Sequence, residues 1–362
     1  MTFALFVVSC PCALSLATPT ALAASAGALG RRGVVLARPD AIEALAKVTH
    51  VVLDKTGTLT EGKVRLADAR VATGWTRGEA LALAAALEVR SEHPIARALV
   101  AASAGDPDAP GAPAAGALAH APGAGVEGVV PAGRYRLGRI DYVAAIAGAI
   151  PADLGAFARA ADARTSLVAL GSERGFAAVF ALGDVLRHGA KAMVARLAAM
   201  GIEVSVLSGD REAAAVAFAS AAGIARARGD RTPGDKRDAI ADLQSDGAVV
   251  AMVGDGVNDA PPLAQAQVSI SLAQATPVAQ LVSDVVILAG GLERIAEAIA
   301  QARRTRAIVR QNLAWATIYN VVAIPAAALG YVTPLLAALG MSASSLAVVG
   351  NAARLIRPPG SR

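Results

Sequence analysis

The run Asp54-Lys55-Thr56-Gly57-Thr58 follows a short β-branched segment, Val48–Leu53, and decides how the rest of the sequence is interpreted. A short apolar run of this kind is typical of a buried parallel strand, and ligands of such sheets lie at the carboxyl ends of the strands. A carboxylate there, on a loop of small and hydroxyl-bearing residues, can attack phosphorus in line while backbone N–H groups hold the phosphate. The run therefore predicts that Asp54 is a nucleophile that accepts a phosphoryl group.

A second acidic loop follows another apolar run later in the chain. Ala248–Val253 leads into Gly254-Asp255-Gly256-Val257-Asn258-Asp259, which places Asp255 at the end of a second predicted strand. Asp54 and Asp255 together can hold Mg²⁺, a hard cation that takes oxygen ligands. The two loops therefore predict a magnesium-dependent phosphoryl-transfer site.

The other candidates for this site are polar residues near further strand ends. Val204–Leu207 leads into Ser208-Gly209-Asp210, and the Ser208 hydroxyl can donate a hydrogen bond to a phosphate. Lys236 can meet the phosphate as a point charge. The predicted catalytic residues are Asp54, Ser208, Asp210, Lys236 and Asp259.

The middle of the chain alternates strand-like runs, polar loops and helical patterns, which predicts a doubly wound α/β core. Val285–Leu288 is a further strand candidate, and Gly189–Met200 and Asp235–Gln244 have helical patterns. Within 66–175 the residue composition changes. An alanine-rich, helix-like segment, Gly78–Val100, is followed by a Pro/Gly/Ala-rich stretch, Gly105–Gly125. We expect that stretch to be a flexible loop inside an inserted α+β domain.

The composition indicates a protein that lies partly in a membrane. Hydrophobic residues make up 55% of the chain and the net charge is +5, carried mostly by arginine. Three apolar stretches are long enough to span a bilayer: Thr2–Leu29, Leu313–Val332 and Leu335–Leu355. Arginines follow the first, precede the second and follow the third, so they mark one side of the membrane and are not read as a nucleic-acid site. We expect a multi-pass protein of the cell (inner) membrane, with its catalytic domains in the cytoplasm.

These observations predict a division of the chain into five parts. The first membrane helix is residues 1–31, a discontinuous phosphorylation domain is 32–65 and 176–302, a nucleotide-binding domain is 66–175, and two more membrane helices are 307–334 and 335–356.

The two acidic motifs carry a family resemblance. Asp54-Lys55-Thr56-Gly57-Thr58-Leu59-Thr60, with Gly254-Asp255-Gly256-Val257-Asn258-Asp259 much later, resembles the phosphorylation machinery of P-type ATPases on a haloacid-dehalogenase-like core. The resemblance implies ATP as phosphoryl donor and Mg²⁺ as cofactor. It also implies that the backbone carbonyl of Thr56 reaches the Mg²⁺.

Thr56 separates two kinds of enzyme on that core. In the related phosphatases, the residue two positions after the nucleophile is typically Asp, which helps water to release the phosphate. A threonine cannot accept that proton at neutral pH, so the phosphoaspartate should last long enough to drive a conformational change. This favours a transport cycle over a plain phosphatase.

The insert carries a second set of motifs. Ser91-Glu92-His93-Pro94 lies in a helical stretch with Glu88, and Gly123-Ala124-Gly125 and Leu137-Gly138-Arg139 follow. Alone, a histidine here is more often an ordinary helix-boundary residue, and one Gly-x-Gly is weak. Together they resemble the ATP-binding domain of heavy-metal P-type ATPases, with Arg139 where that family usually has Asn. The resemblance implies nucleotide contacts at Glu88, His93, Gly123, Gly125 and Gly138.

Cys10-Pro11-Cys12 lies in the first apolar stretch. Cysteines one residue apart are poor disulfide partners, and Pro11 removes a helical hydrogen bond, which opens the backbone beside the thiols. Thiolates select soft ions such as Cu(I) or Zn²⁺, and polar groups in a membrane span are costly. Without the phosphorylation motif, buried and inert thiols would be the better interpretation.

Two later motifs help to choose among the soft metal ions. Tyr319-Asn320 lies in the second apolar stretch, and Met341 and Ser345 lie four apart on one helical face of the third, although methionine alone is more often core filler. With the cysteines they resemble the copper(I) subgroup, whereas zinc and cadmium pumps usually carry Lys and Asp in the later spans, and Leu313–Leu355 contains neither. Gly340-Met341-Ser342-Ala343-Ser344-Ser345 is also similar to the branch that supplies copper for cytochrome oxidase assembly. The implied copper ligands are Cys10, Cys12, Tyr319, Asn320, Met341 and Ser345.

The resemblance covers nearly the whole chain but only the C-terminal half of the family pattern. The sequence contains neither the earlier spans nor the actuator domain, whose Thr-Gly-Glu loop brings water to the phosphoaspartate. We therefore expect a fragment, or a chain whose N-terminal half is a separate polypeptide, with the lipid bilayer and a copper chaperone or donor as partners. Three alternatives stay open: a membrane-anchored haloacid-dehalogenase-like phosphatase, a zinc- or cadmium-type pump fragment, and a non-enzymatic metal-binding membrane protein.

Overall fold

The computed structural model describes residues 12–38, 40–91, 93–121, 123–162, 164–255 and 259–357. They form two compact units. The core unit contains the residues up to Leu59, Arg187–Gly209 and the residues from Ala219 onward, and the insert unit contains Thr60–Leu186 with Asp210–Phe218.

The core unit is built on a seven-stranded sheet of order β1-β13-β12-β11-β2-β9-β10. Neighbouring strands pair in parallel, except that β1 is antiparallel to β13. The strands are β1 Val34–Leu36, β2 His50–Asp54, β9 Glu203–Leu207, β10 Arg226–Arg228, β11 Val250–Gly254, β12 Val268–Leu272 and β13 Val285–Ile287. Every residue of β11 and β12 is buried, as parallel strands between two helical layers require.

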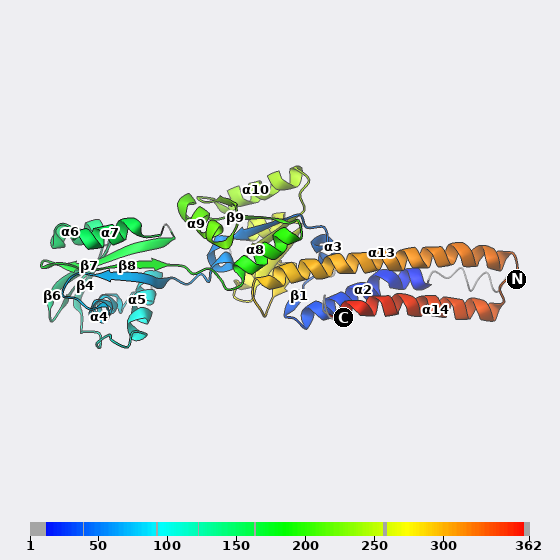
Figure 1. Cartoon of the computed structure of the whole chain (residues 1–362), viewed down its shortest axis with the longest axis horizontal. Helices are drawn as coiled ribbons and strands as arrows, with labels where there is room; N and C mark the ends of the chain where they lie inside the picture. Colours follow the sequence, from blue (N-terminus) through cyan, green and yellow to red (C-terminus); the bar gives the residue numbers. More distant parts are fainter. Residues whose placement is uncertain are drawn as a thin grey trace. The chain divides into compact units, whose positions relative to one another are not determined.

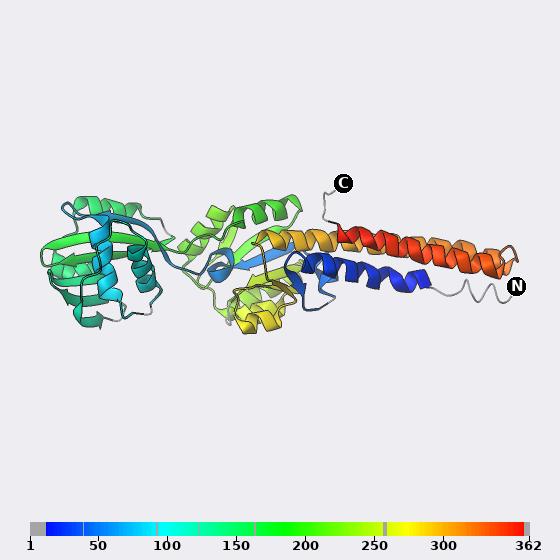
Figure 2. The same cartoon turned by 90° about the horizontal axis from the view of Figure 1, so that it is seen from below.

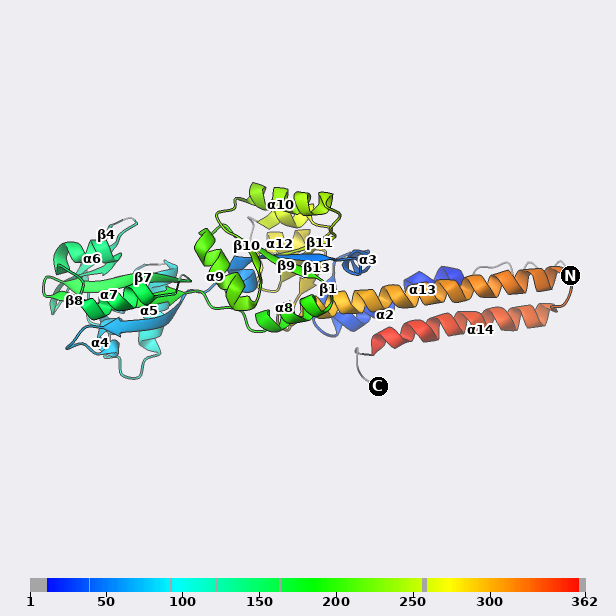
Figure 3. The same ribbon diagram turned by 45° about the horizontal axis from the view of Figure 1, so that its top comes forward.

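Helices cover both faces of this sheet. Val52 and Met252 of the sheet pack with Ile240 and Leu263 of the helices α10 and α11. Figure 3 shows α8 across the sheet from α10. The bounds are α3 Ala41–Leu45, α8 Ala190–Ala199, α9 Glu212–Ala222, α10 Pro233–Ser245, α11 Ala260–Gln265 and α12 Pro277–Val282.

The predicted α/β core is confirmed. The apolar runs at Val48–Leu53, Val204–Leu207, Ala248–Val253 and Val285–Leu288 correspond to β2, β9, β11 and β13. The helical patterns at Gly189–Met200 and Asp235–Gln244 correspond to α8 and α10.

The insert unit is a six-stranded antiparallel sheet of order β3-β8-β7-β6-β5-β4. Leu87 of α4 and Leu99 of α5 pack on one face with Phe180, and Val143 of α6 and Leu154 of α7 pack on the other (Figure 1). The bounds are β3 Arg65–Val71, α4 Arg77–Glu88, α5 Pro94–Ala104, β4 Gly116–Ala121, β5 Gly125–Val130, β6 Gly133–Gly138, α6 Ile140–Ala147, α7 Ala152–Ala160, β7 Thr165–Ser172 and β8 Gly175–Gly183.

Two local predictions for the insert were wrong. Gly78–Val100 is not one helix, because α4 ends at Glu88 and Pro94 starts α5, where a residue without a backbone N–H is tolerated. Gly105–Gly125 is not wholly loop, because it contains β4, the edge strand that pairs with β5. Pairing with a neighbouring strand outweighs the low strand propensity of the Pro/Gly/Ala-rich composition.

Three helices of the core unit pack side by side (Figure 2): α2 (Cys12–Gly30), α13 (Glu293–Ala328) and α14 (Pro334–Ala353), the last followed by a short 3₁₀ turn, Arg354–Ile356. α2 buries a small residue at nearly every fourth position, and small residues allow helix backbones to approach closely. These residues are Ala13, Ala17, Ala21, Ser25 and Ala28.

The expectation of three apolar spans needs correction. Among the described helices, two are long and apolar enough to cross a bilayer, Cys12–Gly30 and Pro334–Ile356. The second stretch, expected at Leu313–Val332, is largely the second half of the 36-residue α13. Polar side chains in this half of α13, Asn312, Tyr319 and Asn320 among them, lower the mean hydropathy of the helix. The part of the first stretch before Cys12 lies outside the described residues.

We predict that Ala21→Leu destabilises the helix bundle. Ala21 has no exposed surface, so a larger side chain must separate α2 from its neighbours at a cost of about 1–3 kcal/mol. Thermal unfolding of the purified protein in detergent measures this. Ala23→Leu is the matched control, since Ala23 is exposed on the same helix. Equal melting temperatures for the two variants would contradict close packing at Ala21.

Candidate active site

Asp54 is the last residue of β2 and is 5% exposed. The side chain of Lys236, in the first turns of α10, donates to Asp54 Oδ1 and, at 2.8 Å, to Asp259 Oδ1. Lys236 and Asp259 are also buried. The structure thus brings together three residues predicted from distant parts of the sequence, with one ammonium bridging two carboxylates.

Asp255 completes a cluster of acidic side chains. One carboxylate oxygen from each of Asp54, Asp255 and Asp259 lies within 4.8 Å of those from the other two. This follows from the sheet, because Leu53 pairs with Val253 in the parallel β2–β11 register, so the residues that follow these strands emerge at one edge.

The cluster fits the magnesium ion predicted from the sequence. Its three carboxylates offer hard oxygen ligands, and Lys236, which contacts two of them, carries a single positive charge. Mg²⁺ bound there would neutralise charge on a phosphoryl group that reacts at Asp54.

Burial and like charges shift the acidity of this site. Loss of hydration, together with the charge of Asp259, raises the pKa of Asp54 to about 7, although Lys236 opposes the shift. The same two causes raise the pKa of Asp255 to about 6. Burial lowers the pKa of Lys236, but Asp54 and Asp259 outweigh it, so the pKa of this ammonium rises. Lys236 is therefore a fixed positive charge at neutral pH.

The turn after Asp54 depends on a glycine. Gly57 has φ +71°, and a Cβ added to it would lie 1.4 Å from Asp255 Oδ2. Only glycine therefore allows the turn to pass the second carboxylate.

Arg187 holds this turn in place and was missed by the sequence analysis. Its guanidinium donates to the carbonyl oxygens of Gly57 (2.5 Å) and Thr58 (3.1 Å), and its backbone N–H donates to Leu59 O (2.9 Å). No local motif identifies Arg187, because it meets the turn only after the whole insert has intervened in the sequence.

Thr58 was also not singled out. Its side chain is fully buried, and within the described residues its hydroxyl has no hydrogen-bond partner. Such a group is costly unless a ligand satisfies it, so Thr58 is a candidate for a phosphate contact. The signal was present in the quoted run, where Thr58 is the second hydroxyl after Asp54.

The remaining predicted residues follow strand β9 or belong to the turn after Asp54. Ser208 is buried just beyond Leu207, which pairs with Asp54 across β2 and β9. Asp210 is half-buried between β9 and α9, and Thr56 is exposed with extended backbone (φ −76°, ψ 128°). Gly256, Val257 and Asn258 lie outside the described residues.

The predicted nucleotide residues gather around one cavity of the insert unit. Its volume is about 470 Å³, and it is lined by Glu88, His93 and Arg139 together with all three predicted glycines, Gly123, Gly125 and Gly138. His93 caps α5, with Nδ1 accepting from the backbone N–H of Ile95 at 3.3 Å. His120 and Ser166 also line the cavity and were not predicted.

The glycines of this cavity have a structural reason of their own. Gly125 pairs with Gly138 across β5 and β6, and a Cβ on either would lie 2.2 Å from a backbone oxygen of the other strand. Gly123 has φ +72° in the preceding turn. The strand pair thus requires Gly125 and Gly138 whether or not they contact a base.

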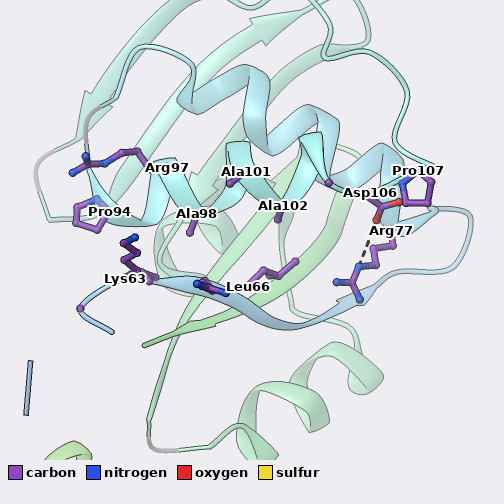
Figure 4. A pocket seen from close by; sticks show the side chains of 14 residues that line it. Lys63, Leu66, Arg77, Pro94, Arg97, Ala98, Ala101, Ala102, Asp106 and Pro107 are labelled. Carbon is purple, nitrogen blue, oxygen red and sulfur yellow. Dashed lines mark ion pairs between the residues drawn. The ribbon is translucent and has the colours of Figure 1, made fainter. Parts of the chain in front are cut away.

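A larger groove of the insert unit, of about 880 Å³, contains none of the predicted residues (Figure 4). Ala98, Ala101 and Ala102 of α5 line it with Leu66 of β3, and basic side chains such as Lys63 and Arg97 lie at its margin. The nucleotide site predicted from the sequence is therefore the smaller cavity, whose lining includes the three glycines and the polar side chains of Glu88 and His93.

The predicted metal ligands that the structure describes lie in the helix bundle. Cys12 begins α2, beside Ala13, which packs with Ala316 of α13 and Val348 of α14. Tyr319 lies against Gly340, with its hydroxyl 3.0 Å from where a Cβ of Gly340 would be. Asn320, Met341 and Ser345 are half-buried on these two helices, and Cys10 lies outside the described residues.

We predict that Gly57→Ala weakens Mg²⁺ binding at least tenfold. The new methyl group would displace the Asp255 carboxylate, on which the cluster depends. Calorimetric titration of the purified protein with Mg²⁺ measures the affinity. Gly74→Ala is the control, since Gly74 also has positive φ but has open space around it. Parental affinity in Gly57→Ala would contradict the proposed role of the turn.

We predict that Mg²⁺ binding releases protons at pH 6.5 and few at pH 8.5. With pKa values of about 7 and 6, Asp54 and Asp255 hold protons below neutrality that the metal must displace. Their pKa values lie above those of the unfolded chain, so the metal-free fold also loses stability as the pH rises from about 4 to 7. Calorimetry in two buffers of different ionisation enthalpy counts the protons. Undiminished release in Asp54→Asn would show that other groups are responsible.

Comparison with known proteins places this geometry in a family. Residues 48–267 match the model of the haloacid dehalogenase-like hydrolase family. The chain is 39% identical over 355 residues to a probable copper-exporting P-type ATPase V of Mycobacterium tuberculosis, covering 98% of this chain and 46% of that protein. It is 40% identical over 353 residues to the nitrogen fixation protein FixI of Rhizobium leguminosarum, covering 97% and 44%. The chain thus spans about half the length of the curated relatives it matches.

A solved structure agrees over almost the whole chain. The crystal structure of a zinc-transporting PIB-type ATPase in an E2.Pi state superposes with a TM-score of 0.88 at 33% identity, covering 97% of this chain and 57% of that one. The relatives therefore include proteins described as copper-exporting and as zinc-transporting. The chain belongs to the haloacid dehalogenase-like hydrolase family and corresponds to the C-terminal portion of heavy-metal P-type ATPases.

Proposed function

We propose that this chain forms a phosphoaspartate at Asp54 from ATP, and that the complete pump uses it to move a soft metal ion, Cu(I), through a membrane. The observation that carries the proposal is the contact of Lys236 with Asp54 inside the cluster of Asp54, Asp255 and Asp259. A nucleophile, a fixed positive charge and a cation-binding carboxylate pair meet there at one sheet edge.

The proposed step follows from these side chains. An Oδ of ionised Asp54 attacks the γ-phosphorus of ATP, the bond from that phosphorus to the β–γ bridging oxygen breaks, and ADP leaves. Lys236 and the hydroxyls of Ser208 and Thr58 are proposed to contact the phosphoryl oxygens. Bound Mg²⁺ supplies the remaining positive charge. Glu88, His93 and the glycines of the insert cavity are proposed to hold the nucleotide.

The proposal for Cu(I) depends on the donor atoms in the bundle. Met341 and, as reduced thiols, Cys10 and Cys12 offer sulfur, and Tyr319, Asn320 and Ser345 offer neutral polar groups. Cys12 is in a disulfide in the structure, so the proposed site requires reducing conditions. Soft sulfur ligands without a carboxylate favour Cu(I) over Zn²⁺. The relative described as copper-exporting supports this ion, whereas the zinc-transporting structure makes Zn²⁺ the alternative.

The bundle is proposed to lie in the cell (inner) membrane, with the core and insert domains in the cytoplasm. α2 and α14 would cross the bilayer, and the exposed apolar side chains of α13, such as Ile318, Val321 and Val322, would face lipid or helices of the rest of the pump. A copper chaperone or other donor, and an N-terminal half carrying the actuator function, are the proposed partners.

We predict that the purified chain, incubated with γ-labelled ATP and Mg²⁺, gives an acid-stable, hydroxylamine-labile phosphoprotein. Asp54→Asn should carry no label, because an amide is not a nucleophile for this transfer. Label that persists in Asp54→Asn, or none in the parent, would refute the assignment.

The same assay distinguishes a pump from a phosphatase. Thr56→Asp adds the acid/base group of the phosphatases on this core and should shorten the life of the phosphoprotein at least tenfold, whereas Thr56→Ser should not. Rapid steady hydrolysis of ATP by the parent chain alone would favour the phosphatase alternative.

A further inference from the structure

The facing surfaces of α13 and α14 carry polar contacts at successive helical turns. Asn312 Nδ2 donates to Val348 O at 3.2 Å, and Asn351 Nδ2 donates to Asn312 Oδ1 at 2.9 Å. One turn further on, Trp315 Nε1 donates to Ser344 Oγ at 3.1 Å. Asn312 and Ser344 are each 2% exposed, so each bond has one buried partner, whereas Trp315 is 51% exposed at the surface of the bundle.

The contacts lead directly to the predicted metal ligands. Tyr319 lies one turn after Trp315 on α13, and Gly340, against which it packs, lies one turn before Ser344 on α14. Ser345 adjoins Ser344, and Met341 adjoins Gly340. The antiparallel pairs 312 with 348, 315 with 344 and 319 with 340 therefore form one continuous register.

Apolar packing alone would fix this register poorly. α14 is rich in alanine, leucine and glycine, and apolar contacts between such residues have no direction. A slip of one residue would shift a helix by about 1.5 Å and turn it by about 100°. The donors of Asn312, Trp315 and Asn351 would then face apolar side chains, which is unfavourable in a dry interior.

We propose that Asn312, Trp315, Ser344 and Asn351 are positioning residues, which hold α13 and α14 in the register that brings Tyr319 and Asn320 to Met341 and Ser345. This inference rests on the proposed metal function of these four ligands. The positioning residues do not contact the ion; they set the distances between its ligands, as outer hydrogen bonds do at other metal sites.

The test uses the whole chain in lipid nanodiscs and measures Cu(I) affinity by competition with a coloured chelator. Trp315→Phe keeps the ring and removes the donor, and Ser344→Ala removes the acceptor. Each should weaken Cu(I) binding about tenfold. The double variant should be no weaker than either single variant, since both remove the same bond.

The matched control is Ser342→Ala, which removes an exposed hydroxyl from the same helix and should bind as the parent does. X-ray absorption at copper should show altered sulfur ligation in Trp315→Phe and Ser344→Ala, while the melting temperature stays within a few degrees of the parent. A merely structural role would lower the melting temperature and leave the copper spectrum unchanged.

Parental affinity in both Trp315→Phe and Ser344→Ala would overturn the inference. A loss in Trp315→Phe alone would also overturn it, because the tryptophan would then act through its ring as an interfacial anchor. Failure of the proposed function has a different signature: the parent would not bind Cu(I), or Cys12→Ser would bind it equally well.

Discussion

The buried contact among Asp54, Asp259 and Lys236 is the constraint on which the rest of the core depends. Asp255 adds a third carboxylate to the two that Lys236 contacts. Burying carboxylates together is unfavourable by itself, and loss of hydration with the charge of Asp259 raises the pKa of both Asp54 and Asp255. A bound cation or a proton would balance these charges, so the arrangement favours binding of Mg²⁺.

The fold must hold these charges together against their repulsion. The parallel pairing of β2 with β11 delivers two of the acidic loops to one edge, and buried β-branched and aliphatic side chains on both faces make that edge rigid. Arg187 closes the arrangement at the point where the chain returns from the insert, because it ties the carbonyls of Gly57 and Thr58 in place. The same loop that presents the nucleophile is therefore anchored by the residue that ends the excursion into the insert.

Structure could be predicted from the sequence where a short segment carries a local signal for its own secondary structure. The strand before Asp54, the acidic loop at Asp255 and the helical pattern around Lys236 each carried a local signal, and one edge of a parallel sheet brings them together. It failed where a distant partner decides: β4 forms because β5 pairs with it, and Arg187 meets the turn through the closed fold. Gly125 and Gly138 were assigned to a nucleotide, yet their opposition across two strands already requires glycine. The roles of the insert and bundle residues stay predictions.

The expected second span, Leu313–Val332, is not among the described helices apolar enough to cross a bilayer, and the polar contacts of α13 give a physical reason. Hydropathy averages all sides of a helix, whereas Asn312 and Trp315 make their hydrogen bonds toward α14 and Ile318, Val321 and Val322 are exposed on its surface. Polar groups that satisfy one another inside a bundle avoid most of the penalty that an average assigns to them. The residues that lower the hydropathy of α13 are therefore the ones that give it a definite partner and register.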